Sequence, residues 1–376
     1  MMRLELLLAG LQLLHVAGWS AYFALTRMVY SGSSEYLVML AAAETIPTIA
    51  GVLGAILAER LGYRPIFLLG IAEGLFLSLT GIWLHRPELL WLAALIASFS
   101  WSLAGPQILG YALTVSGLSA RSLGIVLAGG TIGWSLGGAA APILAAYVGA
   151  DVVLVVSGII VAAIYLVLGL MPQARPSRKG GKGLTRLRYF AVAIIPASLA
   201  FVGTEIVGTI YMAKLSVEME RLGYALGIAL SGFIGAAVRP YAGSLVDRIG
   251  EARVLPLVLI LYAGYIPLLA STHGPIFMAV WLLPLYPLFD VAIYKYAARL
   301  VGEAMGSAAV SSAYSIAGIV LLSAARLRGE TSTYNALAVA AFLAAATAAA
   351  IGSRVVPERS HGEHLIRGPV ERGAGG

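Results

Sequence analysis

Few ionisable side chains fall inside the long apolar runs of this 376-residue sequence, and those few are the first candidates for chemistry. Glu205 lies in the run SLAFVGTEIVGTIY (residues 198–211) and has no basic residue one helical turn away. A carboxyl group in apolar surroundings is costly to ionise unless it is paired, so it is suited to exchanging protons or binding a cation. We therefore predict that Glu205 binds a proton or a cation.

Asp290 and Arg239 form a second candidate site. Asp290 lies in the run 284–296, about two turns from Lys295 and Arg299. Arg239, in the string GFIGAAVRPYAG (232–243), lies eight residues before Asp247, about 12 Å at 1.5 Å per residue and at a depth similar to that of Asp290. We expect the two side chains to pair. Such a pair either has a structural role, because breaking a buried ion pair is strongly destabilising, or takes part in proton and solute binding. Both interpretations stay open.

A third set lies near the N-terminus. Arg27 stands near the end of the first apolar run and Glu44 inside the second, so Arg27 either extends to the membrane surface or reaches Glu44. Glu44 is a further candidate for proton coupling. His15 and Glu73 lie inside the first and third runs. A lone histidine there is more often a packing residue than a ligand, and we assign neither residue a role.

Aromatic and amide side chains complete the candidates for solute contact. They could stack on a solute or hydrogen-bond to it, although tryptophan and tyrosine also anchor membrane interfaces and fill packing. The predicted solute-binding residues are Arg239, Trp19, Tyr22, Arg27, Trp101, Gln107, Tyr211 and Tyr294.

Other kinds of chemistry lack the residues they need. The sequence has no cysteine, no histidine and carboxylate cluster at metal-ligand spacing, and no nucleophile beside a base or phosphate-binding glycine loop. We expect no metal site, no cofactor and no enzymatic activity.

The composition shows what surrounds these residues. Hydrophobic residues make up 60% of the chain, charged residues 11%, and mean hydropathy is +0.89. Soluble domains carry roughly a quarter charged residues, so a bilayer must cover the apolar runs, and every run must be a helix. The net charge of +7 needs no nucleic-acid partner, because the excess falls in loops that face anionic lipid headgroups.

The apolar runs predict twelve membrane-spanning helices. Prolines Pro284 and Pro287 should kink the tenth helix just before Asp290. Breaks at charged or Gly/Pro clusters place the helices at 8–30, 36–58, 64–84, 89–112, 122–149, 151–171, 189–213, 223–245, 253–270, 275–297, 304–324 and 333–353.

One polar break, PSRKGGKG (176–183), divides six helices from six. Most of the 25 lysines and arginines fall in segments on one side of the membrane, which predicts that both termini are cytoplasmic and that the chain lies in the cell membrane. The predicted parts are an N-terminal six-helix bundle (1–172), a basic cytoplasmic linker (173–188), a C-terminal six-helix bundle (189–354) and a flexible cytoplasmic tail (355–376).

The two predicted halves share a motif. ERLGYR (59–64) follows the second helix and DRIGEAR (247–253) follows the eighth, and Glu59 and Asp247 lie half a chain length apart. Internal repeats on this scale are typical of secondary transporters, whose solute site lies near the membrane midplane between the halves. The repeat favours alternating access over a channel.

The segment GSLVDRIG (243–250) resembles the signature of the major facilitator superfamily, a glycine, three residues, Asp-Arg, one residue and a glycine. The first copy, AILAERLGYR (55–64), departs from it with Ala55 and Glu59. The resemblance implies that this loop is a conformational latch. The implied gating residues are Glu59, Arg60, Gly62, Arg64, Gly243, Asp247, Arg248 and Gly250.

The resemblance implies an all-α polytopic membrane protein of two pseudo-symmetric six-helix bundles, with a cavity lined by the first and fourth helices of each half. The implied function is secondary active transport of a small solute by alternating access, coupled to protons, by a monomer. Drug efflux by antiport stays open. So does monocarboxylate transport, because the string around Arg239 looks like the eighth helix of those carriers, although Gly235 stands where they place an acid. An embedded enzyme or a channel is the alternative of another class.

Overall fold

The computed structural model describes residues 2–30, 40, 43–177, 184–325 and 331–355. Within them the secondary structure is helical throughout. The elements, in chain order, are α1 (Met2–Val29), η1 (Ile46–Ala50), α3 (Gly51–Leu61), α4 (Tyr63–Ile82), α5 (Pro87–Val115), α6 (Ala120–Val148), α7 (Ala150–Leu170), α8 (Leu184–Glu218), α9 (Glu220–Ile249), α10 (Glu251–Ser271), α11 (Gly274–Trp281), α12 (Leu285–Val301), α13 (Glu303–Ala325) and α14 (Thr331–Val355).

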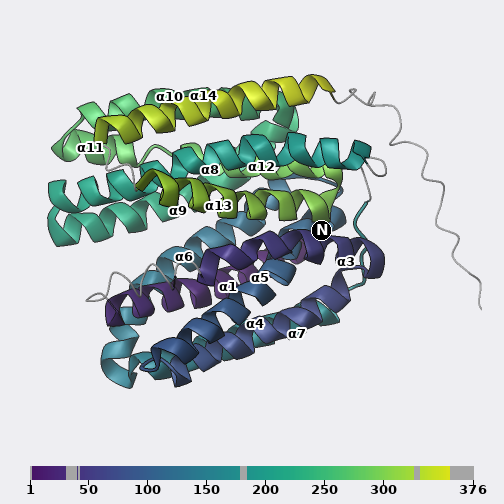
Figure 1. Cartoon of the computed structure of the whole chain (residues 1–376), viewed down its shortest axis with the longest axis vertical. Coiled ribbons are helices and arrows are strands. Elements are labelled where there is room, and N and C mark those ends of the chain that lie inside the picture. The colour runs from purple at the N-terminus through teal and green to yellow at the C-terminus, as the bar shows by residue number, and fades with distance from the viewer. Residues whose placement is uncertain (1, 31–39, 41–42, 178–183, 326–330, 356–376) are drawn as a thin grey trace, which may run out of the picture.

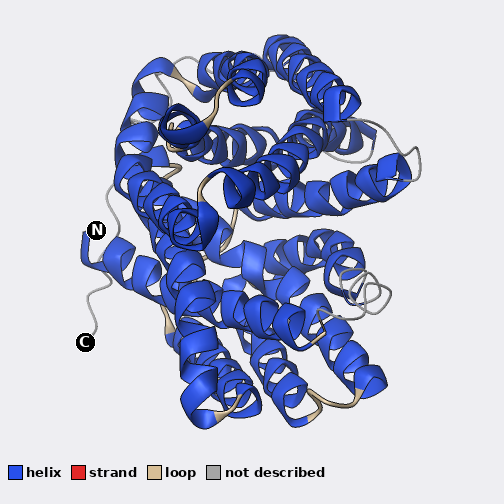
Figure 2. Cartoon of the chain, turned by 90° about the vertical axis from the view of Figure 1, so that its left-hand side faces the viewer, coloured by secondary structure: helices blue, strands red, loops and turns tan. Residues whose placement is uncertain are grey.

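The helices form two bundles in chain order. Helices α1 to α7 pack into one bundle and α8 to α14 into the other. The first bundle lies below the second in Figure 1, and Figure 2 shows the same two bundles from the side. Pairs α4 with α7 and α10 with α14 form the two outermost layers. The bundles meet where α6 packs on α9 and where α13 packs on α3 and α5. The exact boundaries of the predicted domains stay a prediction.

Loop contacts define the two ends of the molecule. At one end Tyr111 of α5 donates a hydrogen bond to the carbonyl of Pro172, at 3.1 Å, and Asp247 of α9 contacts the start of α6. We call this the linker end, because the described part of the linker lies there. At the far end Tyr30 donates to the carbonyl of Leu84, at 2.6 Å.

Nine helices of the described chain are long and apolar enough to cross a membrane. The three predicted spans outside that set correspond to α3, α9 and α13. All three lie at the contact between the bundles, where small residues such as Gly51 and Ser312 of α3 and α13 face each other. Helices that face protein on that side need less apolar surface than helices surrounded by lipid. The polytopic all-α fold is as predicted.

The predicted tenth span (275–297) corresponds to the membrane-sized stretch Gly274–Val301, but this stretch is not one continuous helix. It is broken into α11 and α12, with Leu282, Leu283 and Pro284 between them. Proline lacks an N–H donor and disfavours helical geometry in the residue before it. Pro287 falls in the first turn of α12, where its missing N–H is tolerated.

Helix α8 also begins earlier than expected. It starts at Leu184, so the last five residues of the predicted linker are helical. Nothing after Gly183 breaks the helix, and a span can continue beyond the lipid. The linker residues 178–183 and the predicted tail from residue 356 on lie outside the described residues.

Glycines fix the closest helix contact in the first bundle. Gly129, Gly133 and Gly137 share one face of α6, and a methyl group added at any of them would meet the backbone of α1. This is the tight packing that glycines at a spacing of four residues permit in membrane helices. It holds α1, which carries Trp19 and Arg27, against α6.

The repeated motif adopts the same local structure in both halves. Glu59 and Asp247 lie in the last turns of α3 and α9, and these helices end at Gly62 and Gly250. Both glycines have positive φ values, 84° and 92°, which other residues adopt only with strain.

Candidate functional site

A cavity of about 300 Å³ lies within the second bundle. Two carboxyl groups, Glu205 of α8 and Asp290 of α12, lie on its wall. The rest of the wall is rich in aromatic rings, contributed by Phe201, Tyr262, Tyr265, Trp281, Tyr286, Phe289 and Tyr314. An apolar pocket with a few convergent polar groups is the usual form of a small-molecule site.

The break between α11 and α12 forms part of this wall. Trp281 and Leu283 border the cavity on one side of the break, and Leu285 and Tyr286 on the other. The interruption frees backbone carbonyls, and the Tyr265 hydroxyl donates to those of Val280 and Trp281 at 3.1 and 3.3 Å. Broken helices are where membrane transporters commonly build their binding sites, because irregular backbone is tolerated beside a cavity.

The expected pair between Arg239 and Asp290 is present. Arg239 Nη2 donates to Asp290 Oδ2 at 2.6 Å. Arg239 is only 5% exposed, does not border the cavity, and lies 5.3 Å from the ring centroid of Tyr286. Its Nε and Nη1 groups have no hydrogen-bond partner among the described residues. The guanidinium therefore supports Asp290 from behind the wall.

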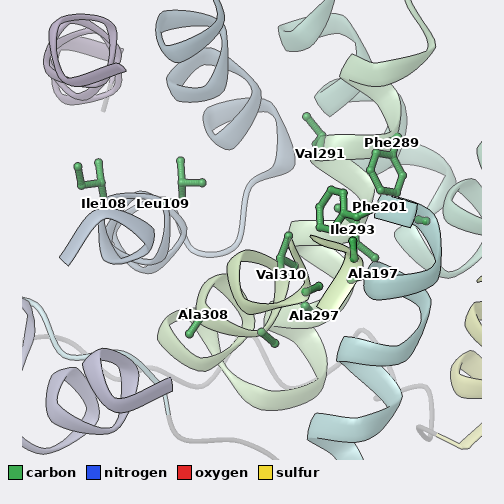
Figure 3. Packing of buried hydrophobic residues seen from close by; sticks show 14 of the residues in the cluster. Ile108, Leu109, Ala197, Phe201, Phe289, Val291, Ile293, Ala297, Ala308 and Val310 are labelled. Atoms are coloured by element: carbon green, nitrogen blue, oxygen red, sulfur yellow. The ribbon is translucent and has the colours of Figure 1, made fainter. Parts of the chain in front are cut away.

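Glu205 has a different environment. Its side chain is exposed because it borders the cavity, and it has no hydrogen-bond or ion-pair partner in the described chain. Phe201, one turn earlier on α8, stacks on Tyr314 with ring centroids 3.8 Å apart and meets Phe289 edge to face. Figure 3 shows Phe201 beside Phe289. Glu205 is thus a carboxyl group on an aromatic wall.

The first bundle encloses a carboxyl group completely. Glu73 of α4 is 0% exposed and is surrounded by donors. Its Oε1 accepts from Trp19 Nε1 and lies 2.6 Å from His15 Nε2, and its Oε2 accepts from the Tyr165 hydroxyl at 2.6 Å. We call these four residues the Glu73 cluster. No sequence pattern joined His15 with Glu73, and Trp19 was expected to contact solute.

Arg27 and Glu44 form the other ion pair of the first bundle. Both guanidinium Nη groups donate to the Glu44 carboxylate, with Arg27 Nη1 2.6 Å from Oε1. The Arg27 guanidinium also lies 4.5 Å from the Phe23 ring centroid. The expected contact is present. A planar two-bond pair of this kind holds both side chains in a fixed geometry.

The other predicted solute-contact residues lie apart from the cavity. Tyr22 and Trp101 pack around Trp19 in an aromatic group of the first bundle. Tyr211 is buried and donates to Asn335 Oδ1 at 3.0 Å. Gln107 is buried with neither amide atom paired among the described residues. Their predicted roles in binding stay predictions.

The last predicted contact residue, Tyr294, is one turn beyond Asp290 on α12. It does not border the cavity. Sequence reasoning missed Tyr286, Phe289 and Tyr314 as a group around Asp290 and Glu205. Only the spacing of Tyr286 and Asp290, one turn apart, signalled a shared face.

At the linker end, Asp247 joins the two bundles. Its carboxylate accepts from the backbone N–H groups of Ala120 and Arg121, at 3.0 and 3.1 Å, where α6 begins, and from Lys295 Nζ at 2.5 Å. Burial alone would raise the pKa of Asp247, but these donors lower it below its ordinary value. An acid at the N-terminus of a helix is stabilised by the helix dipole. We call this contact the Asp247 latch.

The first copy of the motif makes different contacts. Gln173 of the linker accepts from the Arg64 N–H at 3.3 Å and donates to the carbonyl of Leu61 at 2.9 Å. Four residues later, the backbone and hydroxyl of Ser177 donate to Glu303 of α13 at 2.7 and 2.6 Å. The described start of the linker therefore bridges the two bundles.

Three of the remaining gating residues lie in different environments. Arg60 and Arg248 are exposed, and Gly243 packs directly on the backbone of Ala120 and Arg121. A side chain at Gly243 would therefore push α9 away from α6 at the latch. The gating role of all these residues stays a prediction.

Comparisons with known proteins agree with this architecture. The family model of the Major Facilitator Superfamily matches residues 8–325. Among solved structures, the E. coli fucose:proton symporter FucP is similar with a TM-score of 0.73 and 15% identity, covering 93% of this chain and 98% of that one. A bacterial homologue of the iron transporter ferroportin, in an outward-facing state, gives 0.65 and 19%, covering 94% and 99%. The curated proteins gave no match.

At these identities the solved structures establish the fold alone, whereas the family model covers most of the chain. The two helical bundles and the membrane-sized apolar helices agree with that match. The chain belongs to the major facilitator superfamily, a family of membrane transporters.

Proposed function

We propose that the chain is a proton-coupled secondary transporter that moves a small solute through the cavity of the second bundle. The observation that carries this proposal is the unpaired Glu205 on the cavity wall, beside the paired Asp290. An unpaired carboxyl group that water can reach through a cavity exchanges protons, whereas a saturated one is held in a single state.

The contacts between the bundles support alternating access from a state closed at the linker end. The bundles touch where Gly243 meets Ala120, where Gly124 meets Arg239, and where Gly110 meets Glu303. These three contacts lie within about the first four turns from the linker end, and further contacts lie deeper, where Gly232 of α9 meets Ser135 of α6 and where Thr48 of η1 hydrogen-bonds to Ser315 of α13. With the predicted orientation this closed end is cytoplasmic.

The structure favours other solutes over a carboxylate. A carboxylate carrier would need a cation free to face the solute, yet Arg239 is already paired with Asp290 and lies behind the ring of Tyr286. Among the described residues that border the cavity there is no lysine, arginine or histidine. A solute carboxylate would meet two acids there.

Distance measurements between spin labels would test alternating access without knowledge of the solute. The chain has no native cysteine, so introduced cysteines are the only labelling sites. Leu61 and Ile249 occupy matching exposed positions at the linker end of α3 and α9. Tyr147 and Ile276 are exposed at the far end of α6 and α11. The two pairs report opposite ends of the contact between the bundles.

In proteoliposomes, Asp247→Asn should lengthen the distance between labels at Leu61→Cys and Ile249→Cys. It should shorten the distance between labels at Tyr147→Cys and Ile276→Cys in the same sample. The change Glu218→Gln, which alters a far-end acid of α8 that contacts His273 and Gly274, is the control and should leave the first pair unchanged. Opening at the linker end without closure at the far end would contradict alternating access.

A further inference from the structure

The cavity of the second bundle has the chemistry of a site for an organic cation, and this inference rests on the proposed function. Its charged groups are two acids, and one of them, Asp290, is already neutralised by Arg239. Glu205 is left without a counter-ion among the described residues. When Glu205 is ionised, the wall therefore carries one uncompensated negative charge inside the membrane, which only a cation or a proton can offset.

The aromatic rings around Glu205 favour an organic over an inorganic cation. Inorganic cations bind to several oxygen ligands at short range, and no group of three acids or histidines lies together in the described chain. The faces of tyrosine, phenylalanine and tryptophan rings instead attract alkylammonium groups and stack on apolar parts of a ligand. The volume of about 300 Å³ suits a fragment-sized molecule.

We propose that this cavity binds an aromatic or alkyl ammonium ion, with Glu205 as its counter-ion and the rings of Tyr286 and Tyr314 around the ammonium group. The Phe201 ring, one turn from Glu205 on α8, stacks on Tyr314 and holds that tyrosine in place at the cavity wall. The hydroxyl of Tyr286 donates to the carbonyl of Ser231 at 3.0 Å, which fixes the second ring. Both rings are thus positioned before a ligand enters.

A single carboxylate cannot hold a proton and a cation together. Binding of the ammonium ion to protonated Glu205 releases one proton to water, and departure of the ion allows one proton to return. The other titratable groups near Glu205 are Asp290 and Tyr286 of α12, Tyr262 and Tyr265 of α10, and Tyr314 of α13. The tyrosines stay neutral and Asp290 stays paired, so Glu205 is the group that exchanges. This chemistry corresponds to antiport of a cation against a proton.

Equilibrium binding to the purified full chain in detergent tests the inference without requiring transport. The probes are benzyltrimethylammonium, benzyl alcohol and phenylacetate, which share an aromatic ring and differ in charge. Titration calorimetry should show the cation binding at least about tenfold more tightly than the other two. An indicator dye in weak buffer should register proton release with the cation only.

Variants separate the roles of the residues. Glu205→Gln should abolish both the preference for the cation and the proton release, and Glu205→Asp should restore them. Tyr314→Leu should weaken cation binding about threefold with proton release intact. Glu218→Gln, on the same helix but away from the cavity, should match the unaltered chain.

Three outcomes would overturn the inference. These are tighter binding of phenylacetate, binding of none of the probes, and a cation preference that survives in Glu205→Gln. In each case the label distances at the two ends of the molecule would still report whether the chain alternates, so the proposed function would be judged separately.

Discussion

The two bundles each hold a glutamate within the membrane, and their surroundings are opposite. Glu73 of the first bundle is 0% exposed and contacts three buried side chains, whereas Glu205 of the second borders a cavity without a partner. A carboxyl group whose two oxygens both accept hydrogen bonds from buried donors contributes to stability, because removing it leaves those donors unpaired. One whose acceptors are free can bind a proton or a ligand. Residue type alone therefore does not identify the functional glutamate.

The ion pairs extend the contrast. Arg27 and Glu44 of the first bundle form a two-bond pair, and the Glu44 side chain is nearly fully buried. Arg239 donates to Asp290 through one nitrogen and leaves two others unpaired. The ion pair of the first bundle is therefore the better satisfied of the two pairs, and Asp290 of the second pair borders the cavity together with Glu205.

The largest effect on stability is expected for Glu73→Ala. Three donors, from His15, Trp19 and Tyr165, would lose their acceptor inside the protein, at a cost of about 3–5 kcal/mol. Thermal unfolding in detergent should show a large drop in apparent Tm, and Tyr165→Phe, which removes one donor, should show a smaller one. If Glu73→Ala kept normal stability but changed the solute flux, Glu73 would have a functional role, and the contrast with Glu205 would not hold.

The next effect belongs to the Arg239 and Asp290 pair. Either Asp290→Asn or Arg239→Gln should cost about 2–4 kcal/mol, less than at Glu73 because the Asp290 side chain is 22% exposed. The two changes combined should cost clearly less than their sum, because the pair is lost only once. Additive costs in the double-mutant cycle, measured by thermal unfolding, would show that the two side chains do not interact.

A smaller effect is expected at the Asp247 latch. The lowered pKa means that the carboxylate stabilises the closed linker end above the ordinary aspartate value of 3.8, and that this stabilisation is lost as pH falls through the lowered value. Because the group is partly exposed, Asp247→Asn should change the closed-to-open ratio by about fivefold, or about 1 kcal/mol. Spin-label distances between Leu61 and Ile249 measure this ratio. Glu59→Gln in the first copy of the motif is the matched control. An equal effect of that change would show that both copies of the motif stabilise the closed linker end.

The smallest change in stability, within about 0.5 kcal/mol, is expected for Glu205→Gln, because no described partner is lost. Its functional effect should nevertheless be complete. Flux driven by a pH gradient in proteoliposomes should fall to the level of protein-free vesicles, while exchange of solute across the membrane persists. Proton-driven accumulation by this variant would remove the coupling role of Glu205 and bring the two glutamates closer in function.

Much of the architecture could be predicted from sequence because lipid imposes a simple rule. Every apolar run of about 20 residues must be a helix, and the ends of those helices are marked by charge, glycine or proline. The pairing of Arg239 with Asp290 could be expected as well, because depth along a helix can be counted. The break at residues 282–284 could be expected only as a kink, because proline bends or breaks a helix depending on its neighbours.

By itself, the sequence determined the number of helices, their repeat in two halves and the depth of each buried charge, because those quantities depend on local composition and on a fixed rise per residue. Only the tertiary structure decided which carboxyl group is satisfied and which is free. His15 of α1 and Tyr165 of α7 lie 150 residues apart and meet at Glu73, while Glu205 meets a cavity. The rotation of one helix against another sets these contacts, and that rotation depends on packing across the whole bundle.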